Sequence, residues 1–535
     1  MKPFDANGAF LPPTQDAGLR RLAVRGAGIT LLSQVLLLGI QIIATVVLSR
    51  LLTPADFGVV AMVTTFSLLL ASFGQIGFPE AVVQRNDIDH FLVSNLFWIN
   101  LGAGLLLTIG FAAAGSLLAR FYGDPRVAHI AIAASLTIFI TSTSVLHLAL
   151  LKRAMRFSAV SANDIIARAV SVGVSIFLGW VGLGYWALVA GAVAQALAMS
   201  VGAWILCRWI PGLPRRTTGT GSAVRFAMKV YARFGGDYIT RNMDNLLVGW
   251  RFGSVSLGFY KKAYDLFALS SNQLLSVFPV AVSTLSRLNR DPVQYRRYFL
   301  GGLSVLALVG MGVGGDLTLV GQDIVRLVLG PGWEASGRML AIFGPGIGVM
   351  LIYGTHGIIH LSIGTPGRWF KWGIVEITVT GLLFLLGLHW GPAGIAAAWT
   401  ASFWILIVPA FWYAGRPIRF GFTQVLGAVW KYFLASLLAG CACFAIIRGI
   451  QPMFTASGSL GAVTRILTNS LVFAALYLGG VVLLHRGFAP LHQVAGLFPD
   501  IVRWRRFLKP APTADAANAG DASVILTATT TGDTA

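Results

Sequence analysis

Apolar runs of about 20 residues recur along the whole chain, and they constrain its fold more than any other feature. A run of that length crosses the roughly 30 Å hydrocarbon core of a bilayer as an α-helix. Only 11% of the 535 residues are charged, whereas about a quarter are charged in a typical soluble domain. The mean hydropathy is +0.75. The sequence therefore predicts an all-α polytopic membrane protein.

The apolar windows predict fourteen transmembrane helices. They cover about residues 26–49, 57–79, 91–118, 127–149, 164–182, 185–207, 226–250, 255–284, 298–322, 336–362, 370–389, 391–413, 427–447 and 463–484. Residues 1–25 are polar and lack the pattern of a secretory signal peptide, so we expect the first helix to serve as the insertion signal. After the last span, residues 487–509 are typical of a basic, interfacial amphipathic segment, and residues 510–535 of a disordered tail.

The net charge of +20 is explained by membrane topology. If the N-terminus is cytoplasmic, 25 of the 40 Lys and Arg residues fall in cytoplasmic segments and 8 on the opposite side. Cytoplasmic loops of membrane proteins carry such an excess of cations. We therefore expect both termini in the cytoplasm and no nucleic-acid partner.

The connections between spans leave no room for an extramembrane catalytic domain, since none exceeds about 20 residues. The three cysteines, Cys207, Cys441 and Cys443, all lie in apolar segments and indicate neither a disulfide framework nor a metal site. We therefore expect the activity to lie within the helix bundle, without enzymatic chemistry and without a cofactor.

Two stretches repeat at one fixed offset of 200 residues. Gly58 matches Gly258, and "FPEAV" at 78–82 matches "FPVAV" at 278–282. Six spans separate the copies, so both copies have the same membrane orientation, as in transporters built from parallel repeats. The repeat predicts two pseudo-symmetric six-helix lobes, at 26–210 and 226–413, joined by a cytoplasmic linker at 211–225. Two additional helices follow at 427–484.

The seventh span carries a stripe of charges on one face. Its members follow one another at spacings of four, four, four and three residues: Lys229, Arg233, Asp237, Arg241 and Asp244. At about 100° per residue they share roughly one third of the helix circumference. A charge at bilayer depth costs at least about 2.5 to 3.5 kcal/mol, so the stripe should face protein or a water-filled cavity.

The eighth span carries a second, weaker polar face, with Lys261, Asp265 and Asn272 within about 40° of one another and Tyr264 beside them. Simpler interpretations remain open for these charges. Lys229, Lys261 and Lys262 lie near span ends, where lysines reach toward the lipid headgroups. Arg241 and Asp244 have the spacing of an intrahelical ion pair.

Several motifs, in this order, resemble polysaccharide exporters of the Wzx type. They are "LSRLLTPADFGVVAM", "FGQIGFPEAVVQR", "ALLKRAMRF" and the stretch from "YITRNMDN" through "VFPVAVSTLSRLNRD". These exporters belong to the multidrug/oligosaccharidyl-lipid/polysaccharide (MOP) flippase superfamily. The resemblance implies a bundle of twelve to fourteen helices in two lobes around a central cavity. It also implies a flippase of the bacterial inner membrane for undecaprenyl-diphosphate-linked oligosaccharides, working by alternating access in lipopolysaccharide or exopolysaccharide biosynthesis. A polysaccharide polymerase and chain-length machinery would be its further partners.

A diphosphate held without hydrolysis needs cations, and Arg and Lys supply donors that match phosphate oxygens. For this function we expect Arg233, Arg241 and Lys261 on the diphosphate, with Asp237, Asp244, Asp265 and Asn272 completing the substrate site. Glu376, a lone carboxylate in the eleventh span, suits ion coupling or a structural hydrogen bond. His356 and His360 share a helix face, but no third metal ligand is visible in the sequence.

Two alternative functions agree less well with the sequence. A cation-coupled multidrug exporter of the same superfamily should have a site dominated by acids, whereas cations equal or exceed acids on the seventh and eighth spans. A membrane glycosyltransferase or polymerase would be expected to display its polar residues on a long extracytoplasmic loop, which this sequence does not contain.

Overall fold

The computed structural model describes residues 3–5, 8–10, 19–73, 75–85, 88–215, 220–275, 278–288, 291–450 and 459–493. Within these ranges, the side chains of residues 19–27, 84, 232, 233, 237, 240, 270–275, 278–280, 450, 459 and 460 are outside the description. The chain divides into a compact unit at Met1–Leu484 and a second unit at His485–Ala535. The predicted tail at 510–535 and most of the predicted amphipathic segment at 487–509 therefore lie outside the described residues.

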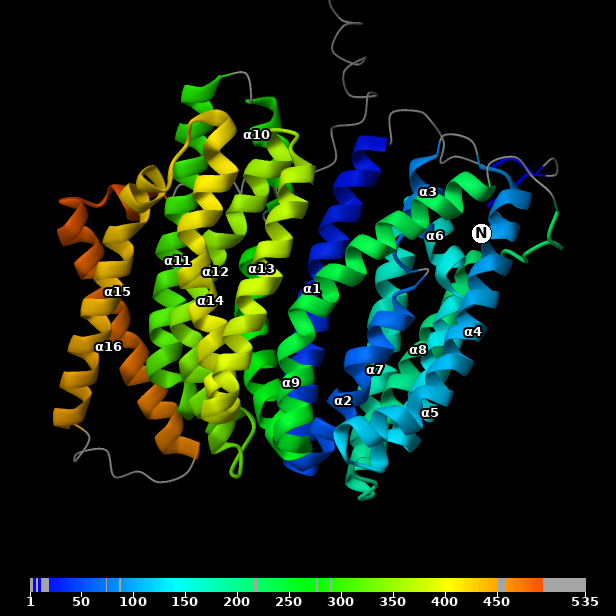
Figure 1. Cartoon of the computed structure of the whole chain (residues 1–535), viewed down its shortest axis with the longest axis horizontal. Helices are drawn as coiled ribbons and strands as arrows, with labels where there is room; N and C mark the ends of the chain where they lie inside the picture. Colours follow the sequence, from blue (N-terminus) through cyan, green and yellow to red (C-terminus); the bar gives the residue numbers. More distant parts are fainter. Residues whose placement is uncertain are drawn as a thin grey trace, which may run out of the picture. The chain divides into compact units, whose positions relative to one another are not determined.

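The first unit is built from α-helices (Figure 1). In chain order they are α1 (Leu19–Leu51), α2 (Pro54–Ala71), α3 (Phe78–Gln84), α4 (His90–Tyr122), α5 (Arg126–Ser142), α6 (Val145–Arg153), α7 (Phe157–Trp180), α8 (Tyr185–Cys207), α9 (Thr220–Leu275), α10 (Phe278–Arg287), α11 (Pro292–Val328), α12 (Glu334–Ser362), α13 (Pro366–Gly387), α14 (Gly391–Gly415), α15 (Phe422–Ile450) and α16 (Ser459–His485). Short 3₁₀ turns, η1 (Leu388–Trp390) and η2 (Arg416–Ile418), flank α14.

Eleven candidate membrane spans, selected by length and apolar composition, lie in the described parts of the chain. One of them, Pro366–Ile418, contains both α13 and α14. α9 is not among the eleven, and it carries charged residues along much of its length. These two features account for the difference from the fourteen spans that the sequence predicts.

Helix boundaries differ from the prediction at the Phe-Pro motifs. α2 ends at Ala71 and α3 begins at Phe78, so the predicted span at 57–79 was wrong at its end. Pro79 lies in the first turn of α3, where its missing N–H costs nothing, whereas a helix interior would lose a hydrogen bond there. α9 ends at Leu275 and α10 begins at Phe278, so the described parts of the predicted span at 255–284 belong to two helices.

Helices pair in the same pattern in the two halves of the unit. α4 packs on α5 and α7 on α8 in the first half, while α11 packs on α12 and α13 on α14 in the second. The first half comprises α1–α8, and the second begins with α9 and ends with α14. α9 contacts α2 as well as α12 and α14, so it packs against the first half as well as its own. α15 packs on α11, and α16 reaches the same helix through a hydrogen bond from the Tyr477 hydroxyl to the Leu308 carbonyl, 2.7 Å long.

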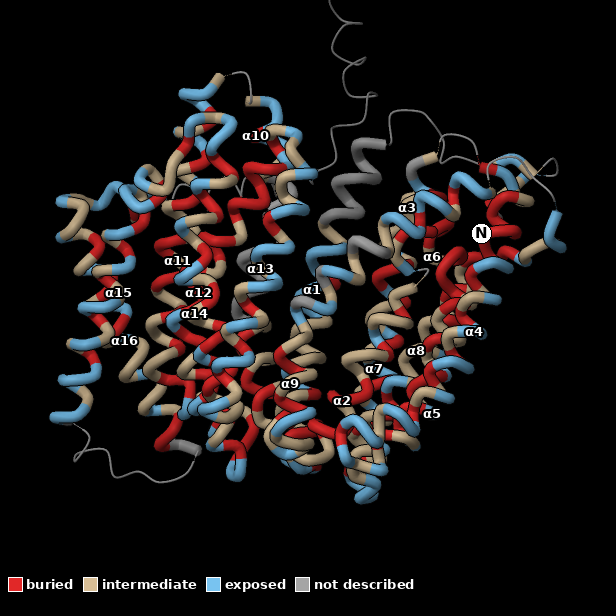
Figure 2. The backbone as a smooth tube through the Cα atoms, viewed as in Figure 1, coloured by how far each residue is buried: buried red, intermediate tan, exposed pale blue. Residues whose placement is uncertain are grey.

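Burial follows this packing. Buried residues run along α11 and α12, whereas many residues of α15 and α16 are exposed (Figure 2). One apolar core cluster includes residues from both halves, among them Met62, Phe343 and Trp399. Large apolar side chains such as Leu386 and Leu471 are exposed, which is expected for helices whose outer faces contact lipid.

Candidate functional site

The kink in α9 positions the candidate site. Gly253 has φ 79° and ψ −177°, a conformation that residues with a side chain rarely adopt. The kink divides α9 into two segments and brings residues 16 positions apart into contact. The Tyr260 hydroxyl donates to Asp244 Oδ2 at 2.7 Å, and the Asn245 amide donates to Asp244 Oδ1 at 2.8 Å. Asp244 and Tyr260 are 1% and 0% exposed, so this polar contact is fully inside the protein.

Charged residues continue along the second segment of α9. Lys261 forms an ion pair with Asp265, one helical turn further along. Lys261 also lies within electrostatic range of the Asp244 carboxylate. Both members of the ion pair keep about a third of their side-chain surface exposed, so they remain accessible to a charged ligand.

For Lys262, the structure excludes one of the interpretations left open by the sequence, that it extends to the headgroups. Its side chain is buried, and its Nζ lies 3.9 Å from the centroid of the Phe57 ring of α2. A cation in this position is attracted by the quadrupole of the ring, and this attraction is stronger where water is excluded. Lys262 therefore belongs to the contact between α9 and α2.

The contact between α2 and α9 is reciprocal. A Cβ atom on Gly58 would overlap the carbonyl of Ser254, and a Cβ atom on Gly258 would overlap the carbonyl of Pro54. The two contacts are equivalent under the offset of 200 residues, since Gly258 corresponds to Gly58 and Ser254 corresponds to Pro54. The two repeated glycines thus allow the backbones of α2 and α9 to touch, and each repeat presents the same surface to the other.

Further contacts join the two halves at this end of the bundle, which we call the kink end (residues 49–57, 124–126, 252–262 and 327–333). Trp333 Nε1 donates to the Ser49 carbonyl at 3.0 Å, and Arg50 donates to the Leu327 carbonyl at 3.1 Å. Arg126 donates to Ser254 Oγ at 3.3 Å. Together with the glycine contact, these bonds hold the two halves together at the kink end.

Asp124 orients Arg126 in this contact. The two side chains form an ion pair of 2.7 Å in the turn between α4 and α5. The hydrogen bonds from Arg126 hold the pKa of the Asp124 carboxyl below its usual value. Asp124 is therefore ionised at neutral pH, and it keeps Arg126 directed toward the other half.

The remaining predicted substrate residues are placed as follows. Arg241 is exposed on the first segment of α9, within electrostatic range of Tyr264. The side chains of Arg233, Asp237 and Asn272 are outside the described residues, although their backbones lie in α9. The structure thus brings Asp244, Lys261 and Asp265 together, and it leaves their role in binding a prediction.

Sequence reasoning missed Tyr260 and the kink-end partners of α9. The repeat identifies Gly58 and Gly258 as equivalent positions, but it does not indicate that their helices are in contact. Tyr260 gave no signal, because its partner Asp244 lies across a kink that an uninterrupted helical periodicity does not show.

Glu376 lies on α13, away from this cluster. The Tyr353 hydroxyl has a hydrogen bond to the Glu376 carboxylate, and Trp372 Nε1 donates to the same hydroxyl at 2.9 Å. His356 and His360 use Nδ1 for contacts with the Tyr353 carbonyl and the Thr365 hydroxyl. Across the described ranges, no group of three or more His, Cys, Asp or Glu side chains is arranged to hold a metal ion.

Comparison with known proteins places these features in context. A family model described as polysaccharide biosynthesis protein matches residues 47–338, which is more than half of the chain. The succinoglycan biosynthesis transport protein ExoT of Rhizobium meliloti is 22% identical, over 69% of this chain and 74% of its own length. The lipopolysaccharide biosynthesis protein WzxC of Escherichia coli is 22% identical, over 59% of this chain and 65% of its own length. The teichuronic acid biosynthesis protein TuaB of Bacillus subtilis is 22% identical, over 79% of this chain and 88% of its own length.

The fold also matches solved structures. The lipid II flippase MurJ, in an inward closed conformation, aligns with a TM-score of 0.67 over 85% of this chain and 98% of its own, at 14% identity. An inward-facing multidrug resistance transporter of the MATE family, within the MOP superfamily, aligns with a TM-score of 0.55, also at 14% identity. The alignment covers 71% of this chain and 94% of the transporter. At this identity the likeness concerns the fold alone.

Proposed function

Because this chain belongs to the polysaccharide biosynthesis protein family of Wzx-like flippases, we propose that it moves undecaprenyl-diphosphate-linked oligosaccharide across the bacterial inner membrane. The family is one of transporters, and the chain is a membrane transport protein for polysaccharide biosynthesis. The oligosaccharide would pass from the cytoplasmic to the periplasmic leaflet and then supply lipopolysaccharide or exopolysaccharide assembly.

The observation that carries this proposal is the charged cluster of α9, between the two halves of the bundle. Lys261 and Asp265 remain partly exposed beside the buried Asp244. Arg241 and Arg233 precede them on the same helix. The cations would hold the diphosphate by charge-assisted hydrogen bonds, while Asp244 and Asp265, with Asp237 and Asn272, would keep those cations in place.

Transport would proceed by alternating access. The contacts at the kink end support a state in which this end is closed, since Trp333, Arg50 and Arg126 each bond across the two halves. Substrate would enter from the other end, and separation of the kink end would release it. Glu376, hydrogen-bonded to Tyr353, is our candidate for ion coupling.

The membrane topology belongs to the same proposal. We infer fourteen crossings, with α9 contributing two of them on either side of Gly253 and with both termini in the cytoplasm. The kink end would then face the periplasm. This orientation follows from the distribution of Lys and Arg.

The test is export in a strain that lacks its own flippase. We expect Arg233→Ala, Arg241→Ala and Lys261→Ala each to reduce polysaccharide export by about tenfold or more, since one lost charge-assisted hydrogen bond is worth about 1.5–3 kcal/mol. The undecaprenyl-diphosphate-linked intermediate should accumulate in the same cells. Arg251→Ala is the matched control, because Arg251 is an exposed arginine of α9 outside the cluster.

Two outcomes would contradict the proposal. One is export at the parental rate by variants that are expressed at normal levels. The other is purified protein in liposomes that moves organic cations but not a lipid diphosphate, which would favour a cation-coupled drug exporter.

A further inference from the structure

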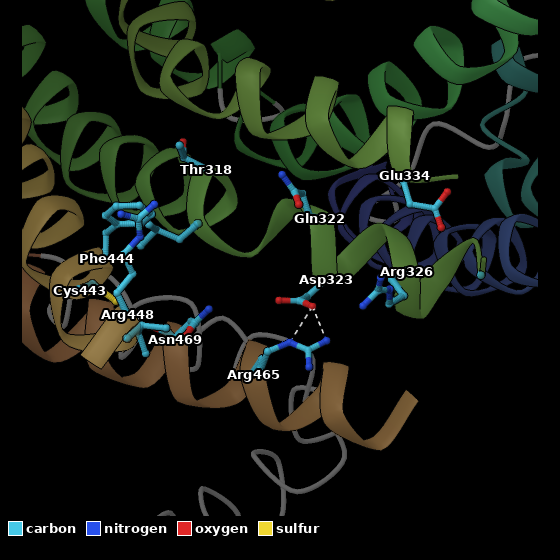
Figure 3. A pocket seen from close by; sticks show the side chains of 13 residues that line it. Thr318, Gln322, Asp323, Arg326, Glu334, Cys443, Phe444, Arg448, Arg465 and Asn469 are labelled. Atoms are coloured by element: carbon cyan, nitrogen blue, oxygen red, sulfur yellow. Dashed lines mark hydrogen bonds and ion pairs between the residues drawn. The ribbon is translucent and has the colours of Figure 1, made fainter. Parts of the chain in front are cut away.

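A second charged region lies between α11, α15 and α16. It surrounds a cavity of about 640 Å³, and no residue of α9 lines it (Figure 3). We propose that this cavity, which we call the α11–α16 cavity, binds the phosphate-bearing headgroup of a membrane lipid. The proposal is independent of the transport substrate and of the site on α9.

The charges of the cavity favour an anion. Three arginines and two acids line it: Arg326, Arg448, Arg465, Asp323 and Glu334. Both acids already have donors. Arg465 donates to Asp323 from Nε and Nη2, at 3.0 and 2.8 Å, and the Gly332 amide donates to Glu334 at 3.1 Å.

Arg465 is paired with Asp323, and Arg326 lies within electrostatic range of Glu334. The lining therefore has a net charge of +1, contributed by Arg326 and Arg448 together. Each lies in the last turn of its helix, α11 or α15, and is exposed. Figure 3 shows both side chains among those that line the cavity, one on each side of the Asp323–Arg465 pair. A guanidinium presents donors in a planar fork that matches phosphate oxygens, which makes a phosphate the best-fitting anion.

The surroundings favour a lipid as the source of that phosphate. Phe444, which lines the cavity, is exposed on α15, and α16 carries exposed large apolar side chains such as Leu467 and Leu471 on other faces. Such faces contact lipid chains, and arginines at helix ends lie at headgroup depth. A headgroup in the cavity would leave the acyl chains along these faces, as in other basic pockets between membrane helices.

The size of the cavity fits the same ligand. A single water occupies about 30 Å³, so one or two ordered waters would not fill this space. Ligand pockets span about 300–1,000 Å³, and this cavity lies within that range. Polar side chains on its wall, Gln322 and Asn469, offer hydrogen bonds to the glycerol or sugar part of a headgroup.

The experiment measures lipid binding to the delipidated full-length protein by native mass spectrometry. The probes are phosphatidylglycerol, a glucosyl diacylglycerol with the same chains but no phosphate, and inorganic phosphate. We expect the parental protein to retain one phosphatidylglycerol, with about tenfold or greater preference over the glycolipid. The double variant Arg326→Gln/Arg448→Gln should lose this preference. Arg251→Gln, which changes an exposed arginine of α9, should keep it.

A second variant acts by volume and leaves the charge unchanged. Gln322→Trp places a bulky ring on the cavity wall, which should obstruct the headgroup and also abolish the preference, so either folded variant is sufficient for the test. The proposal is overturned if both variants retain phosphatidylglycerol as the parental protein does, or if the two lipids bind equally. Binding of inorganic phosphate without binding of the lipid would identify a free-phosphate site and overturn the lipid assignment.

Discussion

At the scale of single residues, the buried polar groups of α9 depend on partners from the protein. Asp244 has no solvent to stabilise it, so its carboxylate depends on donors from the protein. Tyr260 and the Asn245 amide supply them. Lys262 is equally buried, and it meets the face of Phe57 at 3.9 Å. Both arrangements lock the second segment of α9, one against its own first segment and one against α2.

The Asp244–Tyr260 bond predicts a clear loss of stability in one variant. Tyr260→Phe keeps the ring and removes the donor, which leaves a buried carboxylate oxygen without this partner. We expect a loss of about 1–3 kcal/mol, measured as a lower thermal unfolding midpoint of the purified protein. Tyr298→Phe is the control, because Tyr298 is 59% exposed. Equal unfolding of the two variants would show that the bond contributes nothing.

At the scale of elements, α2 and α9 are in contact through their backbones. Gly58 and Gly258 have no side chains to keep the helices apart, and each lies against a carbonyl of the other repeat. Phe78 and Phe278 are the first residues of the short helices α3 and α10. Both pairs of positions are separated by 200 residues, so the repeat extends from sequence to local structure.

This contact predicts that a single methyl group at either glycine destabilises the protein. Gly58→Ala and Gly258→Ala each place a Cβ onto backbone atoms, and overpacking of this kind costs about 1–3 kcal/mol. We expect both variants to unfold at lower temperature and to a similar extent. Gly173→Ala, on the exposed face of α7 with open space around it, should unfold no earlier than the parent. If Gly58→Ala and Gly258→Ala both unfold at the parental temperature, the reciprocal contact is contradicted.

The sequence predicted the helices well where apolar runs were uninterrupted, as in α4 and α8. It failed at 72–77, because a window average does not detect that a proline begins a new helix. It also did not predict that Lys262 is buried. The position near a span end favoured contact with headgroups, and only the packing of α2 shows that Phe57 covers this lysine. The periodicity of a helix does not indicate which residues far apart in the sequence contact it.

At the scale of the whole molecule, the proposed topology assigns each end of the bundle to one side of the membrane. We expect a C-terminal alkaline phosphatase fusion to be inactive and a C-terminal fluorescent protein fusion to be bright, because both termini should face the cytoplasm. Insertion of the same phosphatase between α11 and α12, at 330–332 in the kink end, should give an active enzyme. An active C-terminal phosphatase fusion would exclude an even number of crossings with a cytoplasmic N-terminus.

The reciprocal glycine contact also bears on how such a chain arises. In a symmetric dimer, one surface patch binds its own copy, so that residue i of one subunit meets residue j of the other and the reverse also holds. Positions 54 and 58 meet 258 and 254 in this manner within a single chain. A half-length ancestor of six helices would make the same interface as a homodimer. The two copies of this interface differ in charge, because α9 carries lysines and arginines whereas α2 carries neither.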